Sequence, residues 1–382
     1  MIKSISKKQA IYLLLICLVG TKFQRLPSFL ADVSGKGFWL VFCLYLLIDG
    51  LFLLLALKII DLGDGATLYE MLEKTTGKIF SKIIFVLFGV YFFIITILPY
   101  ESVHEVFADI IFDSLPWKFF AIFMLIAMGT IAVSGLRNIG RMCQMFFYLI
   151  LVGILGLFLL GASTSDVTAI LPIYDVSISS IFTGVYKSSL WFGNFMILFV
   201  FMGRIHNQED KKWGGIKLSY FASGLFITAM CIVFYGIYEH ITPLKRNLLT
   251  KISQFSLLSL DVGRPDWFLI LFAELATILT AGIFIYCSAV SFREVFKCKK
   301  INIIIYILLF LLYINTNYLI RSKLTIFRII ISYGAVFGLI MQYALPLTLL
   351  IIAIIYKKKN VSQKSNNIQL NKTRKRKNYE IN

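Results

Sequence analysis

Charged residues are scarce in this sequence. Asp, Glu, Lys and Arg make up 15% of its 382 residues, whereas soluble domains have about 25%. Hydrophobic residues make up 59%, and a larger core does not explain this excess, because the buried fraction grows only slowly with chain length. The composition excludes an ordinary soluble enzyme and a disordered chain. It predicts a polytopic membrane protein.

Histidine and cysteine are also rare, with 3 and 6 residues respectively. No cysteines are paired as CxxC, so neither a disulfide framework nor a zinc site is indicated. Glu101, His104 and Glu105 resemble half of a carboxylate-bridged metal site, but no second Glu-x-x-His is present. The GxSxG, HExxH, P-loop and GxGxxG motifs are absent. We therefore expect no metal, no cofactor and no enzymatic activity, with a lipid-directed acid–base cluster at these three residues as a rival hypothesis.

The apolar residues gather in ten segments that are long enough to cross a membrane as helices. These segments are roughly 10–30, 38–60, 83–107, 117–133, 142–161, 181–202, 218–239, 267–290, 301–320 and 329–356. Ten segments divide into two halves of five, and an odd number inverts the second half relative to the first. We predict an all-α membrane protein in which residues 1–356 form one permease-like domain with a 5+5 inverted repeat.

The formal net charge is +18, and the Lys and Arg residues that give it lie mainly between the apolar segments. Most of them lie on the side that holds both chain ends, which predicts cytoplasmic N- and C-termini. Residues 357–382 form a basic tail that we expect to be disordered. The tail serves either to attract anionic lipid or only to fix the topology. A nucleic-acid partner would need a folded basic face or aromatic platforms, and neither is present.

Polar residues interrupt the first and sixth apolar segments, which are the first helices of the two predicted halves. A polar run from Thr21 to Arg25 follows Gly20, and Gly193 and Asn194 lie within the sixth segment. Irregular backbone at membrane depth is tolerated only against protein or a wet cavity, and paired breaks indicate a midplane binding site in transporter folds. Half-helix ends and free carbonyls suit the two charges of an amino acid. The alternatives are close packing at glycine and the start of an outer loop.

Other polar side chains within the apolar segments are candidates for function or for structural ion pairing. The candidate intramembrane charges are Asp49, Lys187 and Glu274. Thr277 and Thr280 share one helix face and offer hydroxyls to a ligand or a sodium ion, although threonines in membrane helices often bond their own backbone. Tyr91 is an aromatic candidate to cover a ligand.

Two connections are predicted to contain amphipathic helices. Residues 61–82 include Thr67 three positions before Glu70, which predicts a capping box at a helix start. Residues 240–266 include the stretch Leu248 to Leu260, which is long enough to form a lid over an outer vestibule. Both are equally suited to contact a partner.

A series of short motifs resembles the spore germination permease family, the integral-membrane B subunits of endospore germinant receptors, which belong with the amino acid–polyamine–organocation transporters. The resemblance covers nearly the whole chain, most clearly residues 4–297. Its motifs are Ile5-Ser6-Lys7-Lys8-Gln9, Gly20-Thr21, Leu26-Pro27-Ser28, Ala31, Gly35 and Trp39, Leu68-Tyr69-Glu70 to Gly77-Lys78, Leu171-Pro172-Ile173, Phe192-Gly193-Asn194 and Arg264-Pro265-Asp266.

The resemblance implies a LeuT-like, ten-helix fold with broken helices 1 and 6, and recognition of a small nutrient germinant, typically an amino acid. It also implies A-type and lipoprotein C-type partner subunits in the inner membrane of the spore. An ion-coupled amino-acid transporter of the same fold is the alternative. By the same resemblance, the ligand-binding residues would be Gly20, Thr21, Tyr91, Phe192, Gly193, Asn194 and Thr280. Asn194 stands where the family usually has glutamate, and Asp266 shortens another acidic position.

Overall fold

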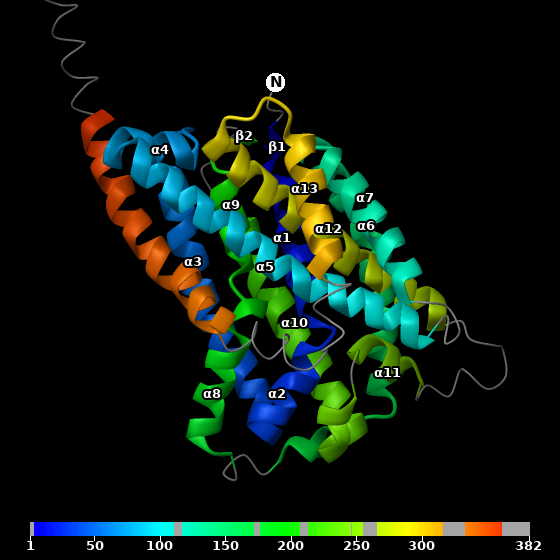
Figure 1. The fold of residues 1–382 in the computed structure, drawn as a ribbon. Coiled ribbons are helices and arrows are strands. Elements are labelled where there is room, and N and C mark those ends of the chain that lie inside the picture. Colours follow the sequence, from blue (N-terminus) through cyan, green and yellow to red (C-terminus); the bar gives the residue numbers. More distant parts are fainter. Residues whose placement is uncertain are drawn as a thin grey trace, which may run out of the picture.

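The structure is a computed structural model that describes residues 4–110, 117–171, 176–206, 213–245, 247–254, 266–315 and 333–360. Within these ranges the chain is almost entirely helical, and the long helices pack side by side (Figure 1). The one sheet described is a pair of two-residue parallel strands, in which Ile5 is opposite Ile205. The prediction of an all-α polytopic membrane protein is confirmed at this level.

The elements follow the chain in this order: β1 Ile5–Ser6, α1 Lys7–Lys22, α2 Leu26–Ser34, η1 Gly35–Gly37, α3 Phe38–Leu62, α4 Leu68–Thr76, α5 Lys78–Ile110, α6 Trp117–Val133, α7 Leu136–Ala162, η2 Val167–Ile170, α8 Ile178–Ser188, η4 Ser189–Trp191, η5 Asn194–Met196, α9 Ile197–Val200, β2 Ile205–His206, α10 Gly214–Tyr238, η6 Glu239–Leu244, α11 Leu248–Gln254, α12 Asp266–Phe296 and α13 Ile301–Ile314. A final helix covers Tyr333–Asn360. It contains a π-helical segment, η10 Ile340–Ala344.

The described residues of the ten predicted apolar segments fall mainly on helix, but only six helices in the described ranges are long and apolar enough to cross a membrane by themselves. They are Leu26–Leu62, Lys78–Val103, Leu136–Ala162, Gly214–Leu244, Trp267–Phe296 and Tyr333–Asn360. Ala121–Val133 and Ile301–Ile314 are shorter apolar helices, and the first and sixth segments are divided by breaks. The final helix also continues to Asn360, past the predicted domain boundary at 356, and the rest of the predicted tail lies outside the described residues.

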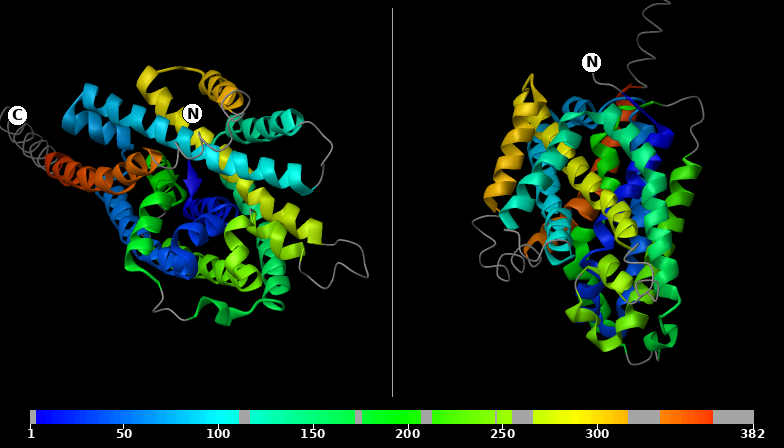
Figure 2. Two further views of the ribbon diagram at one scale, coloured as in Figure 1. Left: turned by 60° about the horizontal axis from the view of Figure 1, so that its bottom comes forward. Right: turned by 90° about the vertical axis from the view of Figure 1, so that its right-hand side faces the viewer.

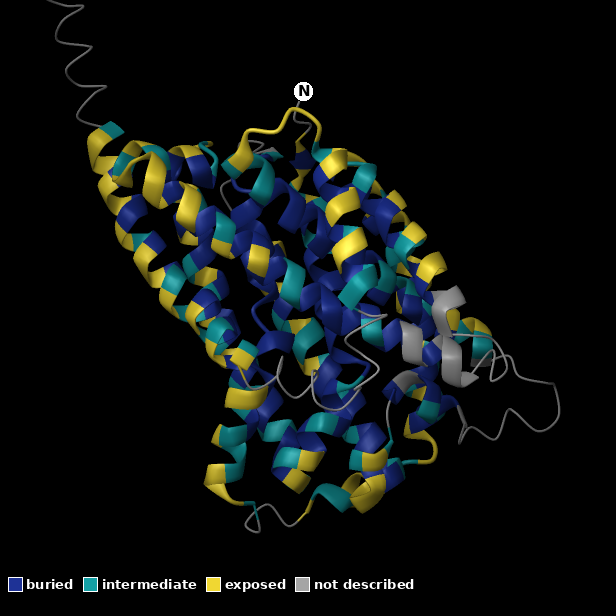
Figure 3. Ribbon diagram, in the orientation of Figure 1, coloured by how far each residue is buried: buried dark blue, intermediate teal, exposed yellow. Residues whose placement is uncertain are grey.

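The lateral surface of the bundle is apolar. Leu51 of α3, Leu159 of α7 and Phe310 of α13 are 67%, 68% and 62% exposed, and Figure 3 shows exposed residues along the outer helices around a buried interior. α1 differs, because its residues from Leu13 to Leu18 are buried on every side. A helix that is apolar all round is expected in the centre of a membrane bundle. α1 therefore runs through the interior, where it packs on α12, α7 and α10.

The first break lies between α1 and α2 and is formed by residues 23–25. α1 ends at Lys22, and α2 begins at Leu26 with Pro27 in its first turn. Proline is tolerated at this position because its missing N–H would have had no intrahelical partner. The polar run from Thr21 to Arg25 therefore marks a real interruption, as predicted. We call residues 23–25 break 1.

The second break extends from Ser189 to Met196 and joins α8 to α9. Phe192 is extended, and Gly193 has a φ of +72° in the left-handed region. Glycine adopts this conformation without the steric penalty of a Cβ atom. The predicted interruption around Gly193 and Asn194 is confirmed, and we call residues 189–196 break 2.

One end of the bundle carries α4, β1 and β2, and the opposite end carries α2, α8 and α11 (Figure 1). α4 has the predicted capping box, because the Thr67 side chain accepts from the Glu70 N–H and the Glu70 carboxylate accepts from the Thr67 N–H. Figure 2 shows the final helix at one side of the bundle, next to α3. α11 covers only part of the predicted amphipathic stretch, whose residues 255–260 lie outside the described ranges.

Candidate functional site

Asn194 of break 2, which is 4% exposed, contacts the last turns of α1, next to break 1. Its amide nitrogen donates to the carbonyl oxygen of Cys17 at 2.9 Å and lies 3.3 Å from the hydroxyl of Thr21. The Cys17 carbonyl also accepts the Thr21 hydroxyl at 2.9 Å, so the Asn194 amide joins an acceptor in the last turns of α1. Two segments separated by more than 170 residues are thus held together by one amide side chain.

Lys22 reaches from the end of α1 into break 2. Its ammonium donates to Oδ1 of Asn194 at 2.7 Å and to the carbonyl oxygen of Trp191 at 3.2 Å. It also lies 4.9 Å from the centre of the Phe192 ring, which is within the range of a cation–π interaction. Lys22 is only 4% exposed, so its charge is held almost entirely by these protein groups. Lys22 was not among the predicted site residues.

Asp49 of α3 is fully buried and contacts break 2 at Gly193. Its carboxylate accepts the Gly193 backbone N–H at 2.9 Å and the Tyr343 hydroxyl at 3.0 Å. The Tyr220 hydroxyl also lies against this carboxylate. Buried carboxylates require such donors, because desolvation of an unpaired charge is very costly. The structure thus brings predicted Asp49 together with predicted Gly193 and Asn194.

Gln342 links the final helix to break 2. Its amide nitrogen is 2.9 Å from the carbonyl oxygen of Ser189, 3.1 Å from that of Phe192 and 3.0 Å from the hydroxyl of Tyr91. Gln342 lies in the π-helical segment η10, and such bulges frequently occur at functional sites. Predicted residues Tyr91 and Phe192 therefore do meet at break 2, through a glutamine that sequence reasoning missed.

An aromatic wall closes break 2 on the side of α3. The Tyr45 ring stacks on Phe192 with centroids 3.6 Å apart and planes 3° from parallel. The Tyr45 hydroxyl donates to the carbonyl oxygen of Val185 in the last turns of α8. We call Lys22, Asp49, Gly193, Asn194 and Gln342 the helix-break site.

Gly20 and Thr280, two of the predicted ligand-binding residues, lie where α1 packs on α12. A Cβ atom on Gly20 would lie 2.3 Å from the Thr280 hydroxyl and 2.5 Å from the carbonyl oxygen of Ala276. Thr280 donates to the carbonyl oxygens of Ala276 and Ile16, at 2.7 and 3.1 Å. The glycine thus permits close packing of α1 on α12, and the Thr280 hydroxyl is bonded to backbone, as the alternative interpretation held. Thr277 is buried beside Glu274.

Glu274 belongs to a second polar cluster, at break 1. The Gln24 amide donates to Oε1 of Glu274, and the carbonyl oxygen of Gln24 accepts the N–H of Leu248 at the start of α11. Among the described residues, Oε2 of Glu274, Oε1 of Gln24 and Oδ1 of Asn247 are buried and have no hydrogen-bond partner at full bonding geometry. The third predicted charge, Lys187, is exposed on α8.

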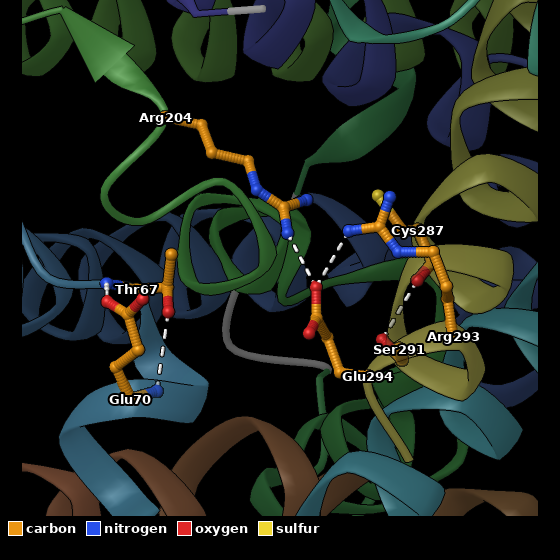
Figure 4. A network of polar contacts seen from close by, with 7 residues as sticks. All are labelled: Thr67, Glu70, Arg204, Cys287, Ser291, Arg293 and Glu294. Atoms are coloured by element: carbon orange, nitrogen blue, oxygen red, sulfur yellow. Dashed lines mark hydrogen bonds and ion pairs between the residues drawn. The ribbon is translucent and has the colours of Figure 1, made fainter. Parts of the chain in front are cut away.

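A third polar network lies at the α4 end of the bundle (Figure 4). The guanidinium groups of Arg204 and Arg293 both contact Oε1 of Glu294, at 2.9 and 2.8 Å. Burial lowers the pKa of Arg204, and the Glu294 carboxylate opposes this effect. The carbonyl oxygen of Arg204 accepts the N–H of Ile5. The segment after α9 is thereby attached both to α12 and to the chain start.

Within the described part of the chain, no group of three or more His, Cys, Asp and Glu side chains is arranged to hold a metal ion. Glu101 is described, whereas the side chains of His104 and Glu105 lie outside the described set. The rival acid–base cluster at these residues is therefore not addressed by the structure.

Known proteins that resemble this sequence are described as spore germination proteins. A family described as "Spore germination protein" matches residues 4–323. "Spore germination protein B2" of Bacillus subtilis (strain 168) is 21% identical over 229 residues. That match covers 60% of this chain and 62% of the relative, so it spans about three fifths of the relative's length.

Proposed function

Because the chain belongs to the spore germination protein family, we propose that it is the membrane subunit of a germinant receptor, and that a small nutrient germinant, an amino acid, binds at the helix-break site. The observation that carries this proposal is the contact of break 2 with the last turns of α1, next to break 1, through Asn194. Broken helices that meet near the middle of a bundle supply free carbonyls and N–H groups together, which suits a zwitterion.

The proposed mechanism is a shift between two conformations. A ligand can change this equilibrium only by its difference in affinity for the two states. The helix-break site is well placed for such a difference, because its residues come from α1, α3, break 2 and the final helix. We propose that A-type and lipoprotein C-type subunits detect the shift. We also propose a ten-helix, LeuT-like inverted repeat, location in the inner membrane of the spore, cytoplasmic termini and contact with membrane lipids.

Deletion and complementation in the native spore test this function. Spores that lack the protein are expected to lose the response to those nutrients that its operon serves, and the wild-type gene is expected to restore it. Co-purification from spore membranes should recover the A- and C-type subunits encoded beside it. Normal germination of the deletion strain on all of those nutrients would refute the proposal.

An ion-coupled amino-acid transporter of the same fold is the second candidate. The observation that favours it is the buried carboxyl of Glu274, whose Oε2 has no partner at full bonding geometry among the described residues, since ionisable groups inside membrane bundles often bind protons or ions. Uptake of labelled amino acids into proteoliposomes distinguishes the two functions. Concentrative uptake that depends on an ion gradient would favour transport, and its absence would favour the receptor.

A further inference from the structure

The polar groups that a break offers to an amino acid are already bound in this chain. A zwitterion needs acceptors for its ammonium and donors for its carboxylate. Here the Lys22 ammonium contacts the Trp191 carbonyl and the Asn194 amide oxygen. The Asp49 carboxylate accepts the N–H of Gly193. The chain thus supplies both charges from its own side chains.

The two charges bind the break rather than each other. The Lys22 ammonium and the Asp49 carboxylate interact electrostatically at a distance. Within the described residues they form no direct ion pair, and the ion pairs described here lie elsewhere. A purely structural pair is expected to place ammonium and carboxylate in contact, because their attraction at contact best offsets the free-energy cost of desolvating both charges. Their separate placement on break 2 is instead the pattern expected of a ligand and its site.

The surroundings of the Lys22 ammonium are specific for a primary amine. A carbonyl oxygen and an amide oxygen accept its N–H groups, and the Phe192 face lies 4.9 Å away. A quaternary ammonium has no N–H to donate, and an alcohol has no charge for the ring or for Asp49. The lysine stem is flexible and can withdraw from such a site without unwinding α1.

We propose that Lys22 is a tethered ligand that occupies an ammonium-binding site formed by Trp191, Phe192 and Asn194, and that a primary-ammonium ligand acts by displacing it. This inference rests on the proposed function for its biological meaning, because the displacing ligand would be the germinant. The site itself is defined by its chemistry and can be tested without germination.

Chemical rescue with purified protein in lipid nanodiscs tests the proposal. Lys22→Ala removes a fragment equivalent to propylammonium, and the variant is expected to unfold at a lower temperature than the wild type. Propylammonium should raise that temperature in a dose-dependent, saturable manner. Intramolecular ligands have effective concentrations of roughly millimolar or more, so the wild type should need at least about tenfold more propylammonium for any response.

Matched controls establish the specificity of the rescue. 1-Propanol and tetramethylammonium should not rescue Lys22→Ala, because one lacks the charge and the other lacks N–H groups. Lys187→Ala, which removes an exposed lysine, should behave as the wild type. Lys22→Met fills the space with an apolar chain and should show no response to propylammonium.

Two results would overturn the proposal: equal responses of Lys22→Ala and wild type to propylammonium, or equal rescue by 1-propanol. If Lys22→Ala is too unstable to purify alone, the measurement is made on Lys22→Ala purified in the presence of propylammonium, which is then removed by dialysis and titrated back. Rescue without any role in germination would refute the proposed function and leave the tethered ligand intact. Loss of germination in the deletion strain, together with failure of chemical rescue, would support the proposed function and refute the tethered ligand.

Discussion

Replacement of Gly193 by alanine is expected to open the helix-break site. The residue has a φ of +72°, and a Cβ atom there would lie 2.4 Å from Cγ and 2.5 Å from Cδ of Gln342. These atoms are close to the glutamine backbone, so a small shift of the amide end does not relieve the overlap. Gln342 must adopt another rotamer and lose its bonds to Ser189, Phe192 and Tyr91.

The size of the effect follows from two contributions. The left-handed conformation costs a non-glycine residue about 1–2 kcal/mol. Buried carbonyls that lose their donor cost about 1–3 kcal/mol. We therefore expect Gly193→Ala to lower the free energy of unfolding by roughly 2–5 kcal/mol.

A matched control and a double-mutant cycle separate these contributions. Gly135 also has a positive φ, +81°, but a Cβ atom there meets nothing within 4 Å, so Gly135→Ala should cost only about 1–2 kcal/mol. Gln342→Ala removes the overlapping Cγ atom, and Gly193→Ala/Gln342→Ala should be less destabilised than the sum of the single variants by about 1–3 kcal/mol. Denaturant unfolding of the purified proteins measures all four values. Additive effects would refute the reasoning.

Three further predictions concern other parts of the chain. Asn194→Leu should lower the free energy of unfolding by about 2–4 kcal/mol, because the Lys22 ammonium and the Cys17 carbonyl both lose a partner; a change below about 0.5 kcal/mol would contradict this. Glu294→Gln should destabilise the protein by only about 1–2 kcal/mol, since Glu294 is 26% exposed and solvent screens the pair; loss of folding would show that the network is more tightly coupled than this. Cys298 is exposed in the connection after α12, so an impermeant maleimide should label it only after the membrane is opened; labelling of intact cells would reverse the proposed topology.

The sequence predicted the breaks well because their signals are local. The polar run after Gly20 and the Gly193–Asn194 pair stand out in apolar segments, and the Thr67–Glu70 capping box depends on a spacing of three residues. Such features are determined by backbone chemistry within one or two helical turns. They therefore remain visible without knowledge of the packing.

The partners at the helix-break site were missed because they depend on tertiary contacts. Lys22 lies in the polar run after Gly20, and a basic residue inside an apolar segment is the signal that could have identified it. Gln342 is a lone amide in the final apolar segment, and its significance comes from a π-helical segment that the sequence does not reveal. Conversely, Lys187 was selected for its position in a segment, although the helix turns it outward, and Thr280 bonds to backbone.

Equilibrium binding tests the central claim, that the germinant binds where break 2 meets the end of α1. An amino acid that triggers germination through this protein is titrated by calorimetry into the purified wild type, Asn194→Ala and the control Lys187→Ala. We predict at least tenfold weaker binding to Asn194→Ala, which corresponds to about 1.4 kcal/mol, and unchanged binding to Lys187→Ala. Wild-type affinity in a folded Asn194→Ala variant would contradict the account.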